Sequence, residues 1–138
     1  MPPRVFVQLT RVADDAWLER LFALPGVERG IFTALASRFD AAAAEGFEGR
    51  VTYELERPAT GAATRRWTVQ VLSGRAVLRP DDHVESAVLL RMSVGDFVRV
   101  AAGAIDPAEP ILKGRARAEG DLGILAKLPE MFRAARPN

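Results

Sequence analysis

The chain has 138 residues, of which 49% are hydrophobic and 27% are charged, and its 19 Lys and Arg nearly balance its 18 Asp and Glu. This length and composition fit a single globular domain, and a net charge of +1 provides no overall attraction for nucleic acid or for an anionic membrane. The absence of Cys excludes disulfides, thiolate nucleophiles and Cys-ligated zinc, and it suits a reducing compartment.

Residues 1–12 are expected to form an N-terminal arm or a short edge strand. Their apolar run is interrupted by Gln8 and Thr10, so it lacks the apolar core of a secretory signal. The uncharged apolar windows of the chain are also too short for a membrane span. We therefore expect one domain over residues 1–138, a cytoplasmic location and no stable membrane insertion.

Two amphipathic helices are expected next. Asp14 or Asp15 can cap the first, which ends at Pro25-Gly26 and turns four residues to one side: Trp17, Leu18, Leu21 and Phe22. The second is expected to continue through an alanine run to Gly46. Its apolar stripe has helical spacing and comprises Val27, Ile31, Phe32, Leu35, Ala36 and Phe39. Each helix needs a partner surface.

From Gly49 the hydrophobic period changes to two, as in half-buried strands. The runs 51–55, 67–71, 76–78 and 84–92 alternate apolar with polar residues and are separated by turn sequences. In the last run, for example, Leu90 and Met92 oppose Arg91. Four successive strands with short turns predict an antiparallel meander that has one solvent-exposed face.

The stretch 93-SVGD-96 has the form of a capping box and is expected to begin a helix. That helix is expected to turn five residues inward: Phe97, Val98, Ala101, Ala102 and Ile105. Asp106 and Pro107 then fit the start of a second, short helix, because Pro at the first helical position sacrifices no hydrogen bond.

A fifth strand and a closing helix are expected to complete the fold. The strand runs from Gly114 to Gly120, Asp121 caps the helix, and Pro129 kinks that helix or ends its first half. The inward residues of the helix are expected to be Leu122, Leu125, Leu128 and Phe132. The element order predicts an α+β fold, with helices on one face of a five-stranded, mostly antiparallel sheet.

Groups that could carry catalysis are scarce. His83 is the single His, and it lies beside Asp81 and Asp82 in an expected turn, where adjacent side chains point apart and do not make a metal site. Glu54 and Glu56 share one strand face, but such carboxylates more often belong to a solvated face than to an acid–base pair. The glycines between 114 and 123 do not match a phosphate-binding loop. We expect no catalytic residue, no metal and no cofactor, and hence not an enzyme.

Two small basic clusters raise the question of an anionic partner. They are Arg65-Arg66 and the group Lys113, Arg115 and Arg117. Arg115 and Arg117 would stand on one face of the fifth strand, where they could meet phosphates or an anionic headgroup. Basic residues also commonly cover a solvated face or protect a sheet edge, and binding of nucleic acid would need exposed aromatics among the charges. We expect no nucleic-acid partner.

Small residues gather where a core strand normally carries large ones. The inward side of the fifth strand offers only Ala116 and Ala118, and the helix that follows Ser93 adds small residues at 101–103. Unless aromatic rings from the helices fill that space, it leaves volume that an apolar guest can occupy. The pattern predicts a cavity for an apolar ligand, and a well-filled core is the alternative.

The last two-thirds of the chain resembles the sterol carrier protein type two family of nonspecific lipid-transfer domains. The matching stretches, within residues 49–132, are 49-GRVTYELE-56, 67-WTVQVLSGRA-76, 93-SVGDFVRVAAGAIDPAEPILKGRARAEGD-121 and 122-LGILAKLPEMF-132. The resemblance lies in the order of the steps: a helix, a Pro-containing loop, a Gly-Lys strand, and an acidic turn into a closing helix.

The resemblance implies a hydrophobic tunnel between sheet and helices that holds a fatty acid, a fatty acyl-CoA or a sterol- or isoprenoid-like lipid without covalent chemistry. The lining it implies is Trp67, Val69, Val71, Phe97, Ala101, Ile105, Ile111, Leu112, Leu125, Leu128, Met131 and Phe132. Phe32 and Leu35 from the second helix, and Ala116 and Ala118 from the fifth strand, complete the expected ligand-binding residues. The alternative is an accessory interaction module, in which the same groove holds a partner helix or forms a homodimer.

Overall fold

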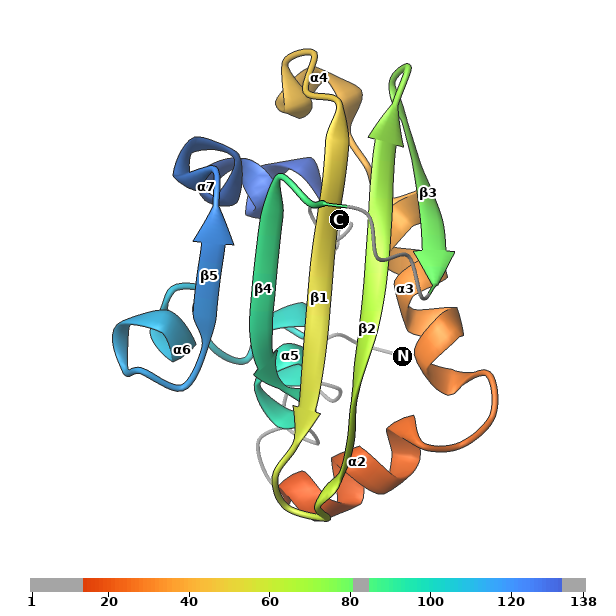
Figure 1. Cartoon of the computed structure of the whole chain (residues 1–138), viewed down its shortest axis with the longest axis vertical. Helices are drawn as coiled ribbons and strands as arrows, with labels where there is room; N and C mark the ends of the chain where they lie inside the picture. Colours follow the sequence, from red (N-terminus) through yellow and green to blue (C-terminus); the bar gives the residue numbers. More distant parts are fainter. Residues whose placement is uncertain (1–13, 81–84, 133–138) are drawn as a thin grey trace.

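The computed structural model of the chain describes residues 14–80 and 85–132, so the expected arm at residues 1–12 and the turn that holds His83 lie outside the described residues. Figure 1 shows the order of the elements along the chain. They are α2 Asp15–Phe22, α3 Val27–Ser37, α4 Ala41–Ala44, β1 Gly49–Arg57, β2 Ala62–Leu72, β3 Arg75–Pro80, β4 Val88–Ser93, α5 Val94–Ala101, α6 Glu109–Leu112, β5 Arg117–Gly120 and α7 Leu122–Met131.

The five strands form one sheet in the order β3-β2-β1-β4-β5. Three of the four pairings are antiparallel, but β1 and β4 run parallel, with Tyr53 opposite Leu90. The predicted meander is therefore wrong at β4, which joins the far side of β1 rather than the free edge of β3. Alternation along a strand identifies its buried face but carries no information about which neighbour it pairs with.

The α+β architecture with helices against one face of the sheet is confirmed. Viewed as in Figure 1, α3, α5 and α7 lie behind the sheet, and α2 closes its lower end. The predicted inward residues of the central strands are all buried on this side: Val51, Tyr53, Leu55, Val88, Leu90 and Met92. Facing them from the helices are Leu18, Phe22, Phe32, Phe97, Leu128 and Met131. This core is where the two layers meet.

The opposite face of the sheet is less exposed than its alternation suggested. Thr52 and Thr68 are buried there, with hydroxyl oxygens 2.9 Å apart, and the Thr52 hydroxyl also contacts that of Ser86. The backbone N–H of Ala87 donates to the carbonyl of Arg50. The segment that precedes β4 thus lies along the start of β1 and covers part of the expected solvent face.

The expected long second helix is two helices. The predicted apolar stripe lies on one helix only as far as the end of α3. Asp40 then adopts an extended backbone, and its carboxylate accepts hydrogen bonds from the N–H groups of Ala42 and Ala43 at the start of α4. The N–H of Asp40 in turn donates to the carbonyl of Met131, at 2.7 Å. An Asx cap competes with helix continuation, which explains the break inside a sequence of high helix propensity.

Helix α5 begins as predicted, because the Ser93 hydroxyl accepts a hydrogen bond from the N–H of Asp96. It ends earlier than expected, at Ala101, and Gly103 follows with φ of 76°, a conformation that suits Gly at a helix end. Phe97 and Val98 are buried, whereas Ala101 is exposed and Ala102 and Ile105 are half-buried. The inward stripe is therefore confirmed only over the first turns of this helix.

The C-terminal elements differ from prediction in three respects. Strand β5 is shorter than expected, since the N–H groups of Arg115 and Ala116 both donate to the carbonyl of Pro110 in a turn rather than to a strand. Helix α7 starts at the Asp121 cap, as predicted, and continues through Pro129 to Met131 rather than ending before it. Leu122, expected inward, is 69% exposed.

Candidate functional site

Aromatic rings fill much of the space between the sheet and helices α3 and α5. Phe32 has no exposed surface and stacks on Phe97 and Trp67, with ring centroids 5.0 and 5.4 Å apart. Its ring centroid also lies 5.4 Å from that of Tyr53, and Phe22 meets Phe97 edge-on at 6.3 Å. These five rings are called the aromatic cluster below.

An apolar pocket lies on the other side of this cluster, between three helices. It has a volume of about 390 Å³, within the range of about 300–1,000 Å³ that is usual for small-molecule sites. Its lining comes from α2 (Trp17, Leu18, Leu21, Phe22), from α3 and its end (Ile31, Ala34, Leu35, Arg38) and from α5 (Phe97, Val98, Ala101). The pocket is thus a groove among helices, with Phe22 and Phe97 shared between it and the aromatic cluster.

The local sequence explains how the pocket arises. Alanine at positions 34 and 101 places the smallest apolar side chains on the surfaces of α3 and α5 that face it. An ion pair between Asp15 and Arg99, at 2.6 Å, joins α2 to α5 beside it. Trp17 lines the pocket and is 53% exposed, so its ring stands at the border between pocket and solvent.

Arg38 is the only charged residue in the lining of this apolar pocket as far as the structure describes it. It follows the last turn of α3, and none of the described residues forms an ion pair with it. A guanidinium presents several N–H donors in a fixed plane that matches a carboxylate. The lining therefore combines an apolar wall with one donor for an anionic group.

The structure distributes the expected ligand-binding residues over several places. Leu35, Phe97 and Ala101 line the apolar pocket, and Phe32 forms part of the aromatic cluster behind it. Trp67 belongs to the cluster and also lines a second pocket, beside the α2–α3 loop. The other buried members are packed in the core: Val69, Val71, Ala116, Leu128, Met131 and Phe132.

The remaining expected residues lie toward the surface. Ile105, Ile111, Ala118 and Leu125 are half-buried, and Ile111, Ala118 and Leu125 pack against the core. Leu112 is 83% exposed and lines neither of the two pockets. The sequence missed most of the pocket, because α2 was not included among the expected ligand-binding elements although its apolar stripe was identified.

Two buried carboxylates also escaped the sequence analysis. Glu28 on α3 accepts hydrogen bonds from the guanidinium of Arg57 and from the indole N–H of Trp67, and all three side chains are buried. Spacing carried a signal, since Glu28 precedes Phe32 by four residues and Ala36 by eight on the buried side of the helix. Glu28 thus attaches α3 to the sheet through Arg57 on β1 and through Trp67, a member of the aromatic cluster, on β2.

Glu19 on α2 plays the corresponding part at the end of the β1–β2 hairpin. Its carboxylate accepts hydrogen bonds from the N–H groups of Ala59 and Thr60, at 3.0 and 2.9 Å, and from the Thr60 hydroxyl at 2.8 Å. Because Glu19 is buried, these donors satisfy a charge that would otherwise be costly to desolvate. Helix α2, one wall of the pocket, is thereby attached to the sheet.

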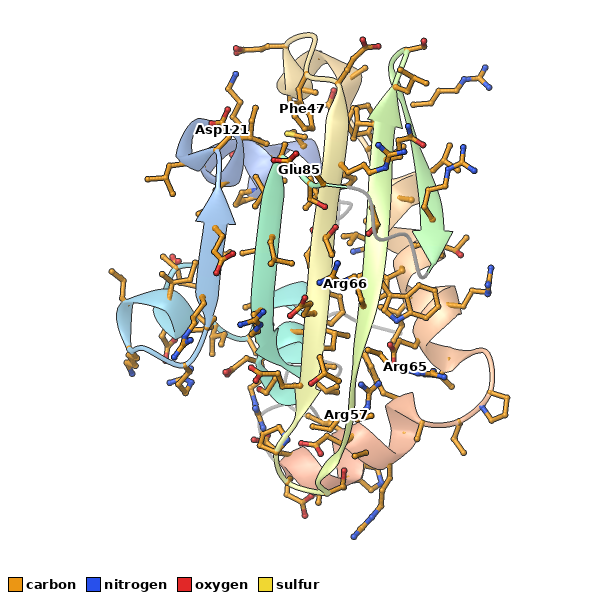
Figure 2. The ribbon with its side chains drawn as sticks, in the orientation of Figure 1. Phe47, Arg57, Arg65, Arg66, Glu85 and Asp121 are labelled. Carbon is orange, nitrogen blue, oxygen red and sulfur yellow. The ribbon has the colours of Figure 1, made fainter. Side chains whose placement is uncertain are left out.

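On the open face of the sheet, Glu54 lies between two arginines. It contacts Arg66 and accepts a hydrogen bond from Arg91 Nε at 2.7 Å. Figure 2 shows Arg66 over this face and Arg57 at the lower end of β1. Burial acts to raise the pKa of Glu54, but the hydrogen bonds and charges of Arg91 and Arg66 outweigh it and lower the pKa. Glu54 is therefore an ionised partner in a salt bridge, not a raised-pKa acid.

The basic residues of the second cluster are partly engaged in the same way. Arg115 Nε lies 3.2 Å from the Asp96 carboxylate, and Nη2 of the same guanidinium lies 3.8 Å from the Glu109 carboxylate.

Within the described ranges, no group of three His, Asp or Glu residues could hold a metal ion. None of the described helices is both long and apolar enough to span a membrane.

Comparison with known families decides the assignment of the chain. The family model described as the SCP-2 sterol transfer family matches residues 32–133, which is most of the chain. The chain belongs to the SCP-2 sterol transfer family. The match begins inside α3, upstream of the stretch from which the resemblance was recognised. No curated protein matches the sequence significantly.

Solved structures of the same fold are distant in sequence. The sterol carrier protein domain 2 of Helicoverpa armigera has 18% identity and a TM-score of 0.59. The match covers 75% of this chain and 85% of the Helicoverpa armigera chain. A palmitated SCP2-like protein from Aedes aegypti has 15% identity and a TM-score of 0.52, covering 76% and 96%. At these identities the similarity establishes the fold.

A similar fold also occurs within an enzyme. The inverting sec-alkylsulfatase from Pseudomonas sp. has 18% identity and a TM-score of 0.61 over 75% of this chain, and this chain spans only 16% of the sulfatase. The family model is described as one of sterol transfer. The Pseudomonas structure shows that the fold is also used as one part of a longer protein.

Proposed function

We propose that the protein binds and carries a fatty acid, or a similar lipid with one anionic end, in the apolar pocket between α2, α3 and α5. The observation that carries this proposal is the composition of the pocket, which offers about 390 Å³ walled by apolar side chains with Arg38 among them. An apolar chain gains free energy by leaving water for such a wall, and Arg38 can pair with the carboxylate.

The single charged residue favours an acid over a neutral lipid. A sterol or a hydrocarbon in the pocket would leave the guanidinium without an anionic partner, whereas a fatty acid would supply one. The related Aedes aegypti protein has been solved in a palmitated form, which supports a fatty acid as the ligand class for this chain as well. A fatty acyl-CoA would need further cationic groups for its phosphates, and Arg38 alone does not provide them.

The proposal is of a carrier without catalysis. The described lining of the pocket contains neither a nucleophile nor a carboxylate or imidazole that could act as a general acid or base. Binding here therefore rests on burial and on one charge pair. For each methylene that enters the pocket, burial contributes about 0.8 kcal/mol, or roughly a fourfold change in Kd, until the volume is filled.

The protein offers a direct reporter for this pocket. It contains two Trp residues, and Trp17 lines the pocket while Trp67 does not. In Trp67→Phe, the remaining emission of Trp17 should shift to shorter wavelength as palmitate displaces water from its exposed ring. Affinity measured with saturated fatty acids of increasing length should rise per methylene and then level off.

Three variants test the assignment of the site. Arg38→Gln should weaken palmitate binding about tenfold or more, since a hydrogen bond to a charged group is worth about 1.5–3 kcal/mol. Arg20→Gln removes the same charge from the exposed side of α2 and should leave affinity unchanged. Ala101→Trp should block the pocket. Palmitate binding that is absent from the wild type, or equally strong in Arg38→Gln and Ala101→Trp, would overturn the proposal.

An interaction module is the second candidate, favoured by the Pseudomonas sulfatase in which the fold is part of a longer chain. In that case the pocket, with the half-exposed Trp17 at its border, holds a partner helix or a second copy. Native mass spectrometry after gentle purification separates the two functions. A co-purified lipid identified after solvent extraction supports the carrier, and a concentration-dependent dimer mass without lipid supports the module.

A further inference from the structure

A second pocket, different in character from the first, lies beside the loop that joins α2 to α3. It has a volume of about 420 Å³, and its walls come from that loop, from the start of α3 and from β2. Three arginines line it, Arg29, Arg65 and Arg66, against one carboxylate, that of Glu28. Figure 2 shows Arg65 on β2 beside this loop, and Arg66 over the open face of the sheet.

The ion pairs of the structure leave two of these charges uncompensated. Glu28 is already paired with the buried Arg57, and Arg66 is paired with Glu54. Arg29 and Arg65 are exposed, and no ion pair links either of them to another described residue. Two guanidinium groups therefore face one concave volume without an acidic partner.

Arg29 is held in a defined place. Its guanidinium carbon lies 5.9 Å from the centroid of the Trp67 ring, a cation–π contact. The Trp67 ring is in turn fixed by the hydrogen bond from its indole N–H to Glu28 and by stacking on Phe32. A cation positioned by a buried aromatic group loses less freedom on binding a ligand than one on a mobile stem.

The backbone adds to the positive potential on the same side. The first turn of α3, an eleven-residue helix, lies in the wall, and no side chain caps the helix at Gly26. The partial positive charge of a helix start adds to that of nearby cations. This charge at the start of α3 adds to the attraction for an anion. The site itself is inferred from the cavity and its two arginines, Arg29 and Arg65.

We propose that this pocket binds the phosphate group of an organic phosphate, with Arg29 and Arg65 as its ligands. A phosphate monoester carries a charge of about −1.5 to −2, which matches two unpaired guanidinium groups, and its oxygens fit their planar donors. The volume exceeds what inorganic phosphate alone would fill, and the apolar residues Ala23, Leu24 and Pro25 in the lining offer a surface for the organic part. This site is separate from the lipid pocket, and neither proposal depends on the other.

The test uses Trp17→Phe, in which Trp67 is the only fluorophore of its kind and lies in this pocket. Titration with adenosine monophosphate or glycerol phosphate at low ionic strength should change its emission, and should shift the amide resonances of residues 26–29 and 65–67. The double variant Arg29→Gln/Arg65→Gln should weaken binding about tenfold or more. Because both side chains are exposed, its thermal unfolding temperature should stay close to that of the parent.

Arg75→Gln is the matched control, since it removes an exposed arginine of the same sheet that lies outside the pocket. It should bind as the parent does. A parallel assay with phosphatidylcholine vesicles, with and without phosphatidic acid, identifies the source of the phosphate. Binding of the soluble esters points to a soluble metabolite, and binding only to phosphatidic acid vesicles points to a lipid headgroup. Equal binding by the double variant and the parent, or resonance shifts confined to other residues, would overturn the site.

Discussion

Phe32 stacks on Phe97 with ring centroids 5.0 Å apart, and this contact joins α3 to α5 across the middle of the core. The stacked pair fills space between the sheet and the two helices. Phe97 belongs both to this stacked pair and to the lining of the apolar pocket, so the pair borders the pocket. The position of these two rings therefore places the accessible apolar volume between the helices.

Replacement of Phe32 tests whether this packing is structural. Phe32→Ala removes a fully buried ring that contacts three others, so the free energy of unfolding should fall by about 3–5 kcal/mol. Urea denaturation followed by circular dichroism measures the loss. If the protein instead keeps its stability, the surrounding rings have collapsed into the space, and the ring is not a structural support.

The Glu28 ion pair should be more important for stability than any exposed pair. Glu28→Gln leaves the buried guanidinium of Arg57 without its counter-charge, and the expected loss is about 3–5 kcal/mol. Glu109→Gln provides the control, because its contact with Lys113 is partly exposed and should contribute about 1 kcal/mol or less. Equal midpoints of chemical denaturation for the two variants would contradict this expectation.

Acid stability should depend on Glu54. Its pKa is lower in the folded protein than in the unfolded chain, so the unfolded state takes up a proton first as the pH falls. The stabilisation from Arg66 and Arg91 is therefore complete above the unfolded pKa, about 4.3, and is lost as the pH falls through the folded value. Thermal unfolding between neutral and acidic pH should show a smaller pH dependence in Glu54→Gln than in the wild type.

Two glycines with positive φ should respond differently to the same substitution. A Cβ at Gly120 would lie 2.1 Å from the carbonyl oxygen of Ala87, whereas one at Gly114 would meet nothing within 4 Å. Both positions carry backbone strain in Ala, with φ of 107° and 76°. Gly120→Ala should also separate β5 from β4 and lower the melting temperature more than Gly114→Ala. A reversed order would show that the close approach to Ala87 is not required.

The sequence by itself determined several local features of this chain. The caps at Asp14, Ser93 and Asp121 are where their side chains predicted them, because a cap needs only the residue and the N–H groups two or three positions later. The alternation of β1 and β4 correctly identified their buried sides. The family, and with it the α+β architecture, could also be recognised from the order of such local signals.

The tertiary structure alone decided how these elements meet. The parallel pairing of β1 with β4, the burial of Glu28 against Arg57 and the stacking of Phe32 on Phe97 join residues that are 29 to 65 positions apart in the sequence. Local propensity contains no term for such contacts. Whether apolar side chains fill a volume or leave it open depends on how all of them pack together, and the small residues of one strand contain no information about that packing.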